Sequence, residues 1–304
     1  MKYIFTNILG EFIYDDTTQK IEKSKDNKQL EDLPKEKLSL VLEIFKDKKY
    51  FKEFYKENLK LSKESIKNSV SEDLLIIQAI SNMGELDKIN NILIKRLREW
   101  YALHFPEFEH LMNNQEKFVD SLIEKDREGL MIEFNINETM GADLAKLHLE
   151  EILLLAKEIK QLQLLRKKHE NYLEKIMKKY CPNLLELGGI TISAKLIELG
   201  RSVKHLAMLP ASTIQLLGAE KALFRHIKMG NKSPKHGVII NHPIVQKAGR
   251  KEKGKAARML ADKLSLCARL DFFKGEFKAK EYREELEKKL GLNKEIKEES
   301  NGQS

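Results

Sequence analysis

One stretch of the chain, between Gly141 and Pro182, contains neither glycine nor proline. About 40 residues at 1.5 Å each would make a helical rod roughly 60 Å long. Such a rod cannot bury its own apolar side, so it must pack against another helix. The residues at alternating steps of three and four, the spacing of a packed helical side, are Ile152, Leu155, Ile159, Leu162, Arg166, His169, Leu173, Ile176 and Tyr180.

We expect the rod's partner to be the helix that precedes it. Pro106 disfavours helix at Phe105, and the residues beyond it keep helical spacing up to Asp126. The chain would then fold back across residues 134–140 as an antiparallel hairpin. Arg166 and His169 lie on the seam, where they would set the register or pair with acids of the facing helix.

The apolar side of the rod is wider than a seam between two helices needs. The extra width comes from four residues, and we predict from it that two hairpins meet in a dimer. These residues are Leu147, Leu154, Leu165 and Tyr172.

The N-terminal residues predict a small α/β domain. Residues 2–14 alternate around Gly10, which is typical of a β-hairpin, and residues 38–45 fit either a strand or a short helix. Four aromatic rings then follow at helical spacing, either as the core of this domain or, if exposed, as a docking patch. They are Tyr50, Phe51, Phe54 and Tyr55. A further helical pattern runs from Glu72 toward Pro106.

Positive charge is concentrated near the C-terminus. The chain has 34% charged and only 7% aromatic residues, which favours a mainly helical fold. Residues 204–281 hold 17 basic and 6 acidic side chains, and the rest of the chain holds 38 and 41. This asymmetry predicts a polyanionic partner at that end. No apolar run approaches a membrane span and no signal peptide is evident, so we expect a soluble intracellular protein.

Residues 209–277 combine two helical segments with a loop of Gly, Lys, Asn and His. Ser212 and Gln215 form a capping-box pattern, which predicts a helix from Ser212 toward Ile227. A last helix over 251–273 would pack on one side and present cations on the other. A Lys/Glu-rich tail follows from residue 278, which we expect to fray into disorder.

An enzymatic alternative rests on the segment from Gly249 to Lys255, which matches GxxxxGK. A P-loop needs a hydroxyl after the lysine and a buried strand before the glycine, but Ala256 follows and a His-Pro segment precedes. Cys181 and Cys267 stand alone in helical patterns, so we expect buried thiols and no metal site. We therefore interpret this segment as a phosphate contact and not as the P-loop of a nucleotide hydrolase.

The same region carries a specific resemblance. The segments LPASTIQ, LGAEKALFR, KHG, HP, GKAAR and ARLD occur in order between residues 209 and 271. Earlier in the chain stand RLREWY, HFPE, MGA and PNL, between residues 96 and 184. Over nearly its whole length the sequence resembles the archaeal Nop scaffold family of box C/D ribonucleoproteins.

The resemblance implies a mainly α fold in four parts. Residues 1–106 would form a small α/β domain with a linker helix that docks the methyltransferase fibrillarin. Residues 107–182 would be a coiled-coil hairpin that self-associates, residues 183–277 an all-α RNA-binding Nop domain, and residues 278–304 a charged tail. The cell would be archaeal and the location cytoplasmic.

The implied function is a non-catalytic scaffold for RNA-guided 2′-O-methylation of ribosomal RNA, with transfer RNA as a further target. Its partners would be a box C/D guide RNA, a kink-turn-binding protein of ribosomal type, and fibrillarin. This chain would hold no cofactor, because S-adenosylmethionine belongs to the methyltransferase. The alternatives are the weak P-loop hydrolase above and a splicing-type Nop-domain protein that binds a kink-turn.

The candidate RNA-binding residues come from charge and from this resemblance. By position, His236 would touch kink-turn bases, and Arg258 and Arg269 would face phosphates. The full set is Glu220, Lys221, Arg225, Lys232, Lys235, His236, Arg250, Lys251, Lys253, Lys255, Arg258 and Arg269.

Overall fold

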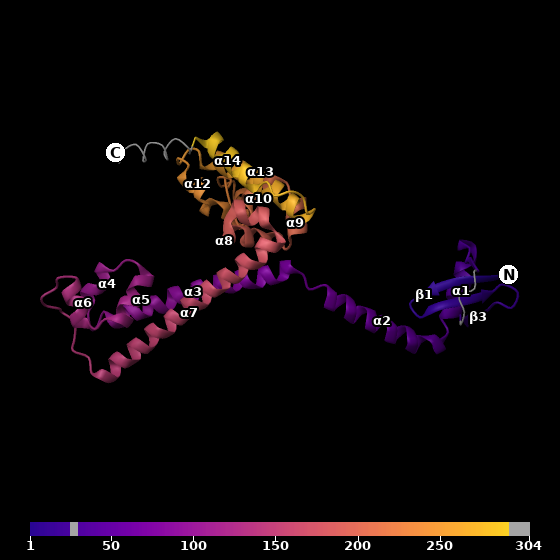
Figure 1. Ribbon diagram of the computed structural model, residues 1–304, viewed down its shortest axis with the longest axis horizontal. Helices are drawn as coiled ribbons and strands as arrows, with labels where there is room; N and C mark the ends of the chain where they lie inside the picture. Colours follow the sequence, from indigo (N-terminus) through magenta and orange to yellow (C-terminus); the bar gives the residue numbers. More distant parts are fainter. Residues whose placement is uncertain (25–29, 292–304) are drawn as a thin grey trace. The chain divides into compact units, whose positions relative to one another are not determined.

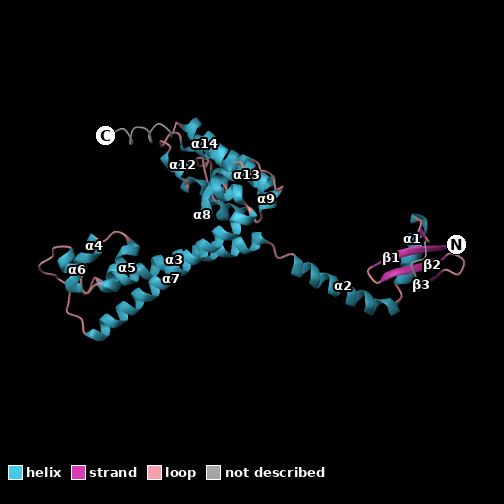
Figure 2. Ribbon diagram, in the orientation of Figure 1, coloured by secondary structure: helices cyan, strands magenta, loops and turns pink. Residues whose placement is uncertain are grey.

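The structure, a computed structural model, describes residues 1–24 and 30–291. The chain divides into two compact units, Met1–Ser71 and Glu72–Ser304. The first holds the small sheet and the second is built from helices (Figures 1 and 2). No helix among the described residues is long and apolar enough to span a lipid bilayer.

The first unit is a four-stranded sheet followed by helices. Strands β1 (Lys2–Asn7) and β2 (Gly10–Asp15) form the predicted antiparallel hairpin. Strands β3 (Lys20–Lys23) and β4 (Glu31–Asp32) complete the order β3-β2-β1-β4, in which β1 and β4 run parallel. The 3₁₀ helix η1 (Lys35–Lys37), α1 (Leu38–Phe45) and α2 (Lys48–Asn68) follow, so the ambiguous segment 38–45 is a helix.

Phe45 is the centre of this unit's core. Its ring lies 5.0 Å from that of Phe12, 4.9 Å from Tyr50 and 5.9 Å from Phe54, measured between centroids. Phe51 and Tyr55 lie on another side of α2 and are 69% and 63% exposed. Of the four aromatic rings, Tyr50 and Phe54 therefore belong to the core, and Phe51 and Tyr55 lie on the surface.

The rod consists of α3 (Glu72–Tyr101) and α7 (Lys146–Tyr180), which lie side by side (Figure 1). The predicted pairing with the segment after Pro106 was only partly right. That segment packs on Ile152, Ala156 and Ile159 of α7, but α3 is the main partner of α7. Periodicity identifies an apolar side without saying which helix covers it. Arg166 does pair with an acid of the facing helix, at 2.7 Å from Asp87 of α3. Helix α3 therefore belongs with residues 146–180 and not, as the predicted range 1–106 implied, with the N-terminal domain.

The segment after Pro106 forms three short helices at one end of the rod (Figure 1). They are α4 (Pro106–Leu111), α5 (Gln115–Glu124) and α6 (Arg127–Glu133). Asn114 caps α5 by accepting from the Glu116 and Lys117 amides, and Asp126 caps α6 through the Gly129 amide. These caps break what the spacing predicted as one continuous helix.

A backbone contact closes this end of the rod. The Ala142 amide donates to Leu103 O at 2.9 Å, and His104 Nδ1 lies 2.8 Å from Ala142 O. A Cβ on Gly141 would stand 1.9 Å from His104 O, so only glycine fits there. The segments HFPE and MGA thus meet in space.

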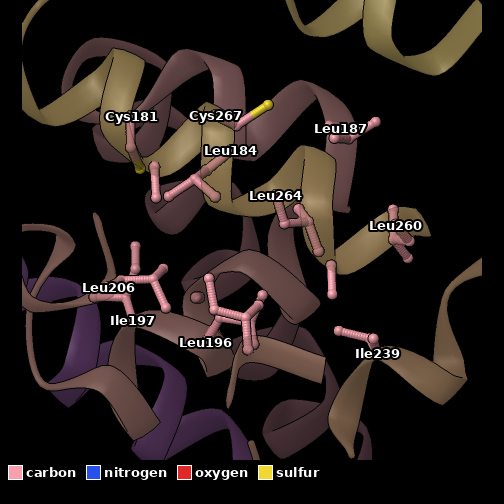
Figure 3. Close-up of a cluster of buried hydrophobic side chains, with 14 of the residues drawn as sticks. Cys181, Leu184, Leu187, Leu196, Ile197, Leu206, Ile239, Leu260, Leu264 and Cys267 are labelled. Atoms are coloured by element: carbon pink, nitrogen blue, oxygen red, sulfur yellow. The ribbon is translucent and has the colours of Figure 1, made fainter. Parts of the chain in front are cut away.

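A helical domain stands at the other end of the rod (Figure 1). Its core includes both cysteines and most of the residues in Figure 3. Both thiols are buried, as predicted. Its helices are α8 (Pro182–Gly200), α9 (Val203–Met208), α10 (Ala211–Leu216), α11 (Glu220–Met229), η2 (Val238–Asn241), α12 (Pro243–Lys247), α13 (Lys253–Phe272) and α14 (Ala279–Leu290).

Two expectations for this domain were wrong. The single helix from Ser212 toward Ile227 is two helices, because Gly218 takes φ +87° and α10 begins without a side-chain cap. The tail was expected to fray from residue 278, yet α14 buries Ala279 and Leu286 against the domain core. The rest of the predicted tail lies outside the described residues.

Asp271 and Asn183 join three helices at the base of this domain. Asp271 accepts from the backbone amides of Asn183 (3.0 Å) and Leu184 (2.8 Å) and from Asn183 Nδ2 (2.9 Å). Asn183 Oδ1 in turn accepts from the amides of Lys278 (2.8 Å) and Ala279. Asp271, near the C-terminal end of α13, therefore caps the N-terminus of α8, and Asn183 of α8 caps the N-terminus of α14.

The contact at Gly141 makes a stability prediction. Gly141→Ala would place a methyl group against His104 O, and overpacking of this kind costs about 1–3 kcal/mol. Gly84, inside α3, has nothing within 4 Å of an added Cβ. Gly84→Ala should therefore stabilise the helix by about 0.5–1 kcal/mol. Urea unfolding of both variants measures the two effects, and equal shifts of the same sign would contradict the close contact at residue 141.

Candidate nucleic-acid interface

The loop 230–237 is tied to the turn between α10 and α11. The Gly237 amide donates to Gln215 O at 2.7 Å, and Gln215 Nε2 donates to Lys235 O at 2.6 Å. A Cβ on Gly237 would stand 1.8 Å from Leu217 O, so the two chain segments touch through backbone. A loop fixed at both these points presents Lys235 and His236 in a defined place.

Lys235 brings the loop to the start of α13. Its Cδ lies 3.5 Å from where a Cβ on Gly254 would stand, so its aliphatic stem covers that glycine. Four further cations lie in the preceding turn and the first turn of α13, where free backbone N–H groups also favour anions. They are Arg250, Lys251, Lys253 and Lys255.

Helix α13 has the two sides that its spacing predicted. Ala257, Leu260 and Leu264 are fully buried, and Arg258 is exposed one turn beyond Lys255. Arg258 also borders a groove of about 450 Å³ between α10, α13 and α14. The structure thus gathers Lys235, His236, Arg250, Lys251, Lys253, Lys255 and Arg258, with Lys232 in the same loop, into what we call the basic surface.

Arg269 lies away from this basic surface. It stands 11 residues after Arg258 on the same helix, which places it about 16 Å further along. Its Nε donates to Ala207 O at 3.2 Å, so part of its guanidinium is used within the fold.

Helix α11 carries the remaining candidates, Glu220, Lys221 and Arg225. None of its residues is buried. Lys221 and Arg225 are exposed one turn apart, and Arg225 Nε donates to Lys221 O at 3.3 Å. The Glu220 carboxylate accepts from the Gly218 amide at 2.7 Å, which gives this acid a local structural contact.

Among the described residues, the structure does not bring together the side chains that a nucleophilic or metal site needs. No group of three His, Cys, Asp or Glu side chains there could hold a metal ion. Burial raises the pKa of the Cys267 thiol to about 12 and that of Cys181 well above its usual range. The GxxxxGK segment follows the five-residue helix α12, where a P-loop would need a strand.

Comparison with known proteins identifies the family. A family model described as "Nop: snoRNA binding domain, fibrillarin" matches residues 82–292. An uncharacterized NOP5 family protein of Methanocaldococcus jannaschii is 38% identical over 256 residues, which cover 79% of this chain and 62% of that protein. The chain belongs to the Nop family.

Eukaryotic Nop proteins are similar too. Nucleolar protein 56 of Schizosaccharomyces pombe is 36% identical over 234 residues, 70% of this chain and 47% of that protein. The chain thus spans between about half and three fifths of these two relatives' length. A solved structure of a fibrillarin/Nop5p complex aligns with a TM-score of 0.49 at 24% identity, covering 96% of this chain and 99% of that one.

The structure adds two surface residues that the sequence reasoning missed. Phe224 and Ile227 of α11 are 63% and 70% exposed, although their spacing is that of a packed side. Periodicity alone assigns such residues to the core. Only the absence of any buried position on α11 shows that this side of the Nop-family chain is free.

His242 makes a pH prediction for the helical domain. Its Nε2 donates to Leu187 O at 2.9 Å, and its Nδ1 accepts from the Ile244 amide at 3.2 Å. Burial lowers the pKa of this imidazole from 6.5. Its stabilising contribution is therefore full above pH 6.5 and is lost as the pH falls through the lowered pKa, because protonation removes the acceptor.

Between pH 6.5 and the lowered pKa, His242 alone should make the free energy of unfolding fall by up to about 1.4 kcal/mol per pH unit. Thermal unfolding between pH 7.5 and 5 measures it. His242→Asn keeps a capping oxygen but does not titrate, so its stability should depend less on pH than that of the natural chain. The exposed His148→Asn serves as control. Identical pH profiles for the natural chain and His242→Asn would show that His242 does not titrate with folding.

Proposed function

We propose that this chain is a non-catalytic scaffold of a box C/D ribonucleoprotein, which binds guide RNA and recruits fibrillarin for 2′-O-methylation. The observation that carries the proposal is the basic surface, fixed by backbone contacts in a chain of the Nop family. Ribosomal RNA is the proposed target, with transfer RNA as a further one, in the cytoplasm of an archaeal cell.

Phosphates would lie along the basic surface and bases against His236. Lysine and arginine side chains contact phosphate oxygens without reading sequence. The imidazole of His236, half-buried between the loop and η2, offers a flat ring to an unpaired base of a kink-turn. Specificity would thus come from the shape of the RNA and from its unpaired bases.

Helix α11 suits a joint contact with RNA and a kink-turn-binding protein. Its exposed cations Lys221 and Arg225 would face phosphates, and its exposed apolar side chains Phe224 and Ile227 would face the protein. A ten-residue helix with no buried residue has little tertiary support of its own. Binding of both partners at once would supply that support.

The methyltransferase would dock on the N-terminal unit. Exposed Phe51 and Tyr55 on α2 give that unit an apolar surface beside its sheet. S-adenosylmethionine would be bound by the methyltransferase, and this chain's part would be to bring that enzyme and the guide RNA into one particle.

Self-association would use the outer side of the rod. Leu147, Leu154, Leu165 and Tyr172 are all exposed on α7, as the width of the apolar stripe requires. A second copy of the rod would cover them, which makes the scaffold a dimer with two RNA-binding ends.

The RNA-binding proposal predicts different effects for two substitutions. Arg258→Ala should weaken kink-turn RNA binding and reduce the slope of log K against log salt by about 1, because one phosphate contact is lost. His236→Ala should cost about 1–3 kcal/mol by loss of stacking and leave the slope unchanged. Filter binding in the presence of the kink-turn protein measures both, with Lys157→Ala on the rod as control.

Equal affinity for a box C/D RNA and for the same RNA with a mutated kink-turn would contradict the scaffold proposal. ATP or GTP turnover that disappears in Lys255→Ala would instead support the P-loop alternative.

The dimer makes a separate prediction. Leu154→Lys combined with Leu165→Lys puts two charges on the proposed interface, so light scattering should change from the mass of two chains to that of one. Both side chains are exposed in the single chain, so its folding should be little affected. Leu61→Lys, an exposed position on α2, is the matched control. A natural chain that scatters as a monomer at micromolar concentration would overturn the two-hairpin interface.

A further inference from the structure

We infer that the C-terminal end of α13 is a second RNA contact, which stacks an unpaired nucleotide that flanks the bound RNA. This inference rests on the proposed function but concerns a different surface. The surface consists of Phe272, Phe273 and Lys274 together with Lys179 of the rod, and we call it the aromatic end.

The first observation is a pair of adjacent aromatic rings, of which one is strongly exposed. Phe272 and Phe273 are 4.9 Å apart between centroids in an edge-to-face arrangement, and Phe273 is 75% exposed. Exposed aromatic rings beside a cationic groove are the means by which proteins hold single-stranded nucleic acid without reading its sequence. Phe277, also exposed, follows on the same connection to α14.

The second observation is a groove of about 690 Å³ beside these rings, with an excess of positive charge. Phe272, Lys179 and Lys274 border it, and of the residues that the structure describes Asp271 is the one carboxylate that does so. The Asp271 carboxylate is already engaged by the amides of Asn183 and Leu184. Among the described residues, neither lysine forms an ion pair, so both cations are available to an anion.

The third observation is strain at Lys274. This residue has φ +53°, a left-handed conformation that costs a residue with a Cβ about 1–2 kcal/mol. The Gly275 amide donates to Leu270 O at 2.8 Å and the Lys274 amide to Asp271 O at 3.4 Å, which is the Schellman ending of a helix. Glycine is the usual residue at this position, so a lysine there indicates a use for its side chain.

The chemistry of these groups favours RNA over a protein partner. Two free lysines and open rings fit phosphates and bases, and the carboxylate that could attract a basic peptide is consumed within the fold. Phe272 stands 14 residues after Arg258 on α13, so about 21 Å, or about six nucleotide steps of 3.4 Å, separate this end from the nearest residue of the basic surface on that helix. The ligand is thus a single strand that continues beyond the kink-turn.

The test compares two RNAs on the full chain with the kink-turn protein present. One is a blunt kink-turn duplex, and the other carries a single-stranded oligouridine extension of about twelve nucleotides, long enough to cover that distance. The extension should tighten binding by at least about fivefold, since one stacked base is worth about 1–3 kcal/mol. Phe273→Ala should remove this gain and leave binding of the blunt RNA unchanged, and Phe51→Ala is the control.

Lys274→Gly separates binding from folding. It should raise the melting temperature by about 2–4 °C, because the left-handed strain is relieved, and yet reduce the gain from the extension. For the RNA with the extension, the slope of log K against log salt should also become less steep by about 0.7, because one phosphate contact to the single strand is lost. A lower melting temperature would contradict the strain at Lys274, and an unchanged gain would count against a binding role for this lysine.

The outcomes distinguish this inference from the proposed function. If the blunt RNA binds and the extension adds nothing, the aromatic end is not an RNA contact and the scaffold proposal stands. If no preference for the kink-turn is found, the scaffold proposal fails, and ultraviolet crosslinking of oligouridine alone decides the inference. A crosslink at Phe272 or Phe273 supports it, and crosslinks confined to other residues overturn it.

Discussion

The helical domain depends on one buried carboxylate, that of Asp271. Burial raises its pKa, and the amides of Asn183 and Leu184 oppose that rise by hydrogen bonding to the charged form. A buried carboxylate is tolerated only when such donors surround it. Because these donors belong to the first turn of α8, the end of α13 cannot move without the helix that continues from the rod. The orientation of the basic surface is therefore fixed relative to α7.

A second buried carboxylate joins the rod to this domain. Asp73, in the first turn of α3, accepts from the Tyr180 hydroxyl at 2.9 Å and from the Val203 amide at 2.9 Å. Burial and this acidic neighbour both raise the pKa of Tyr180, so the phenol stays a donor. Both helices of the rod and α9 thus meet at one group.

The sequence was informative where one local signal decided the structure. The positions of the lysine and arginine residues predicted the cationic side of α13. The alternation of residues 2–14 predicted the β1–β2 hairpin. The sequence was misleading where the structure depends on a packing partner that is distant in the chain. Residue spacing, for example, could not show that α7 packs on α3. Nor could it show that Gly218 interrupts the helix that the Ser212 pattern predicted, since that depends on the left-handed turn held against Val238. Likewise, charge selected Lys235, but only the fold places it over Gly254.

Four of the motif segments that carried the family resemblance form structural contacts. ARLD and PNL meet as Asp271 and Asn183, and HFPE and MGA meet at His104 and Gly141. By contrast, α2 and α11 bury none of their residues. Elements with few buried contacts open most easily and gain most when a ligand binds the folded state. The proposed protein contacts on α2 and α11 therefore lie on helices with little support of their own, whereas the basic surface lies on α13, which is held by the domain core.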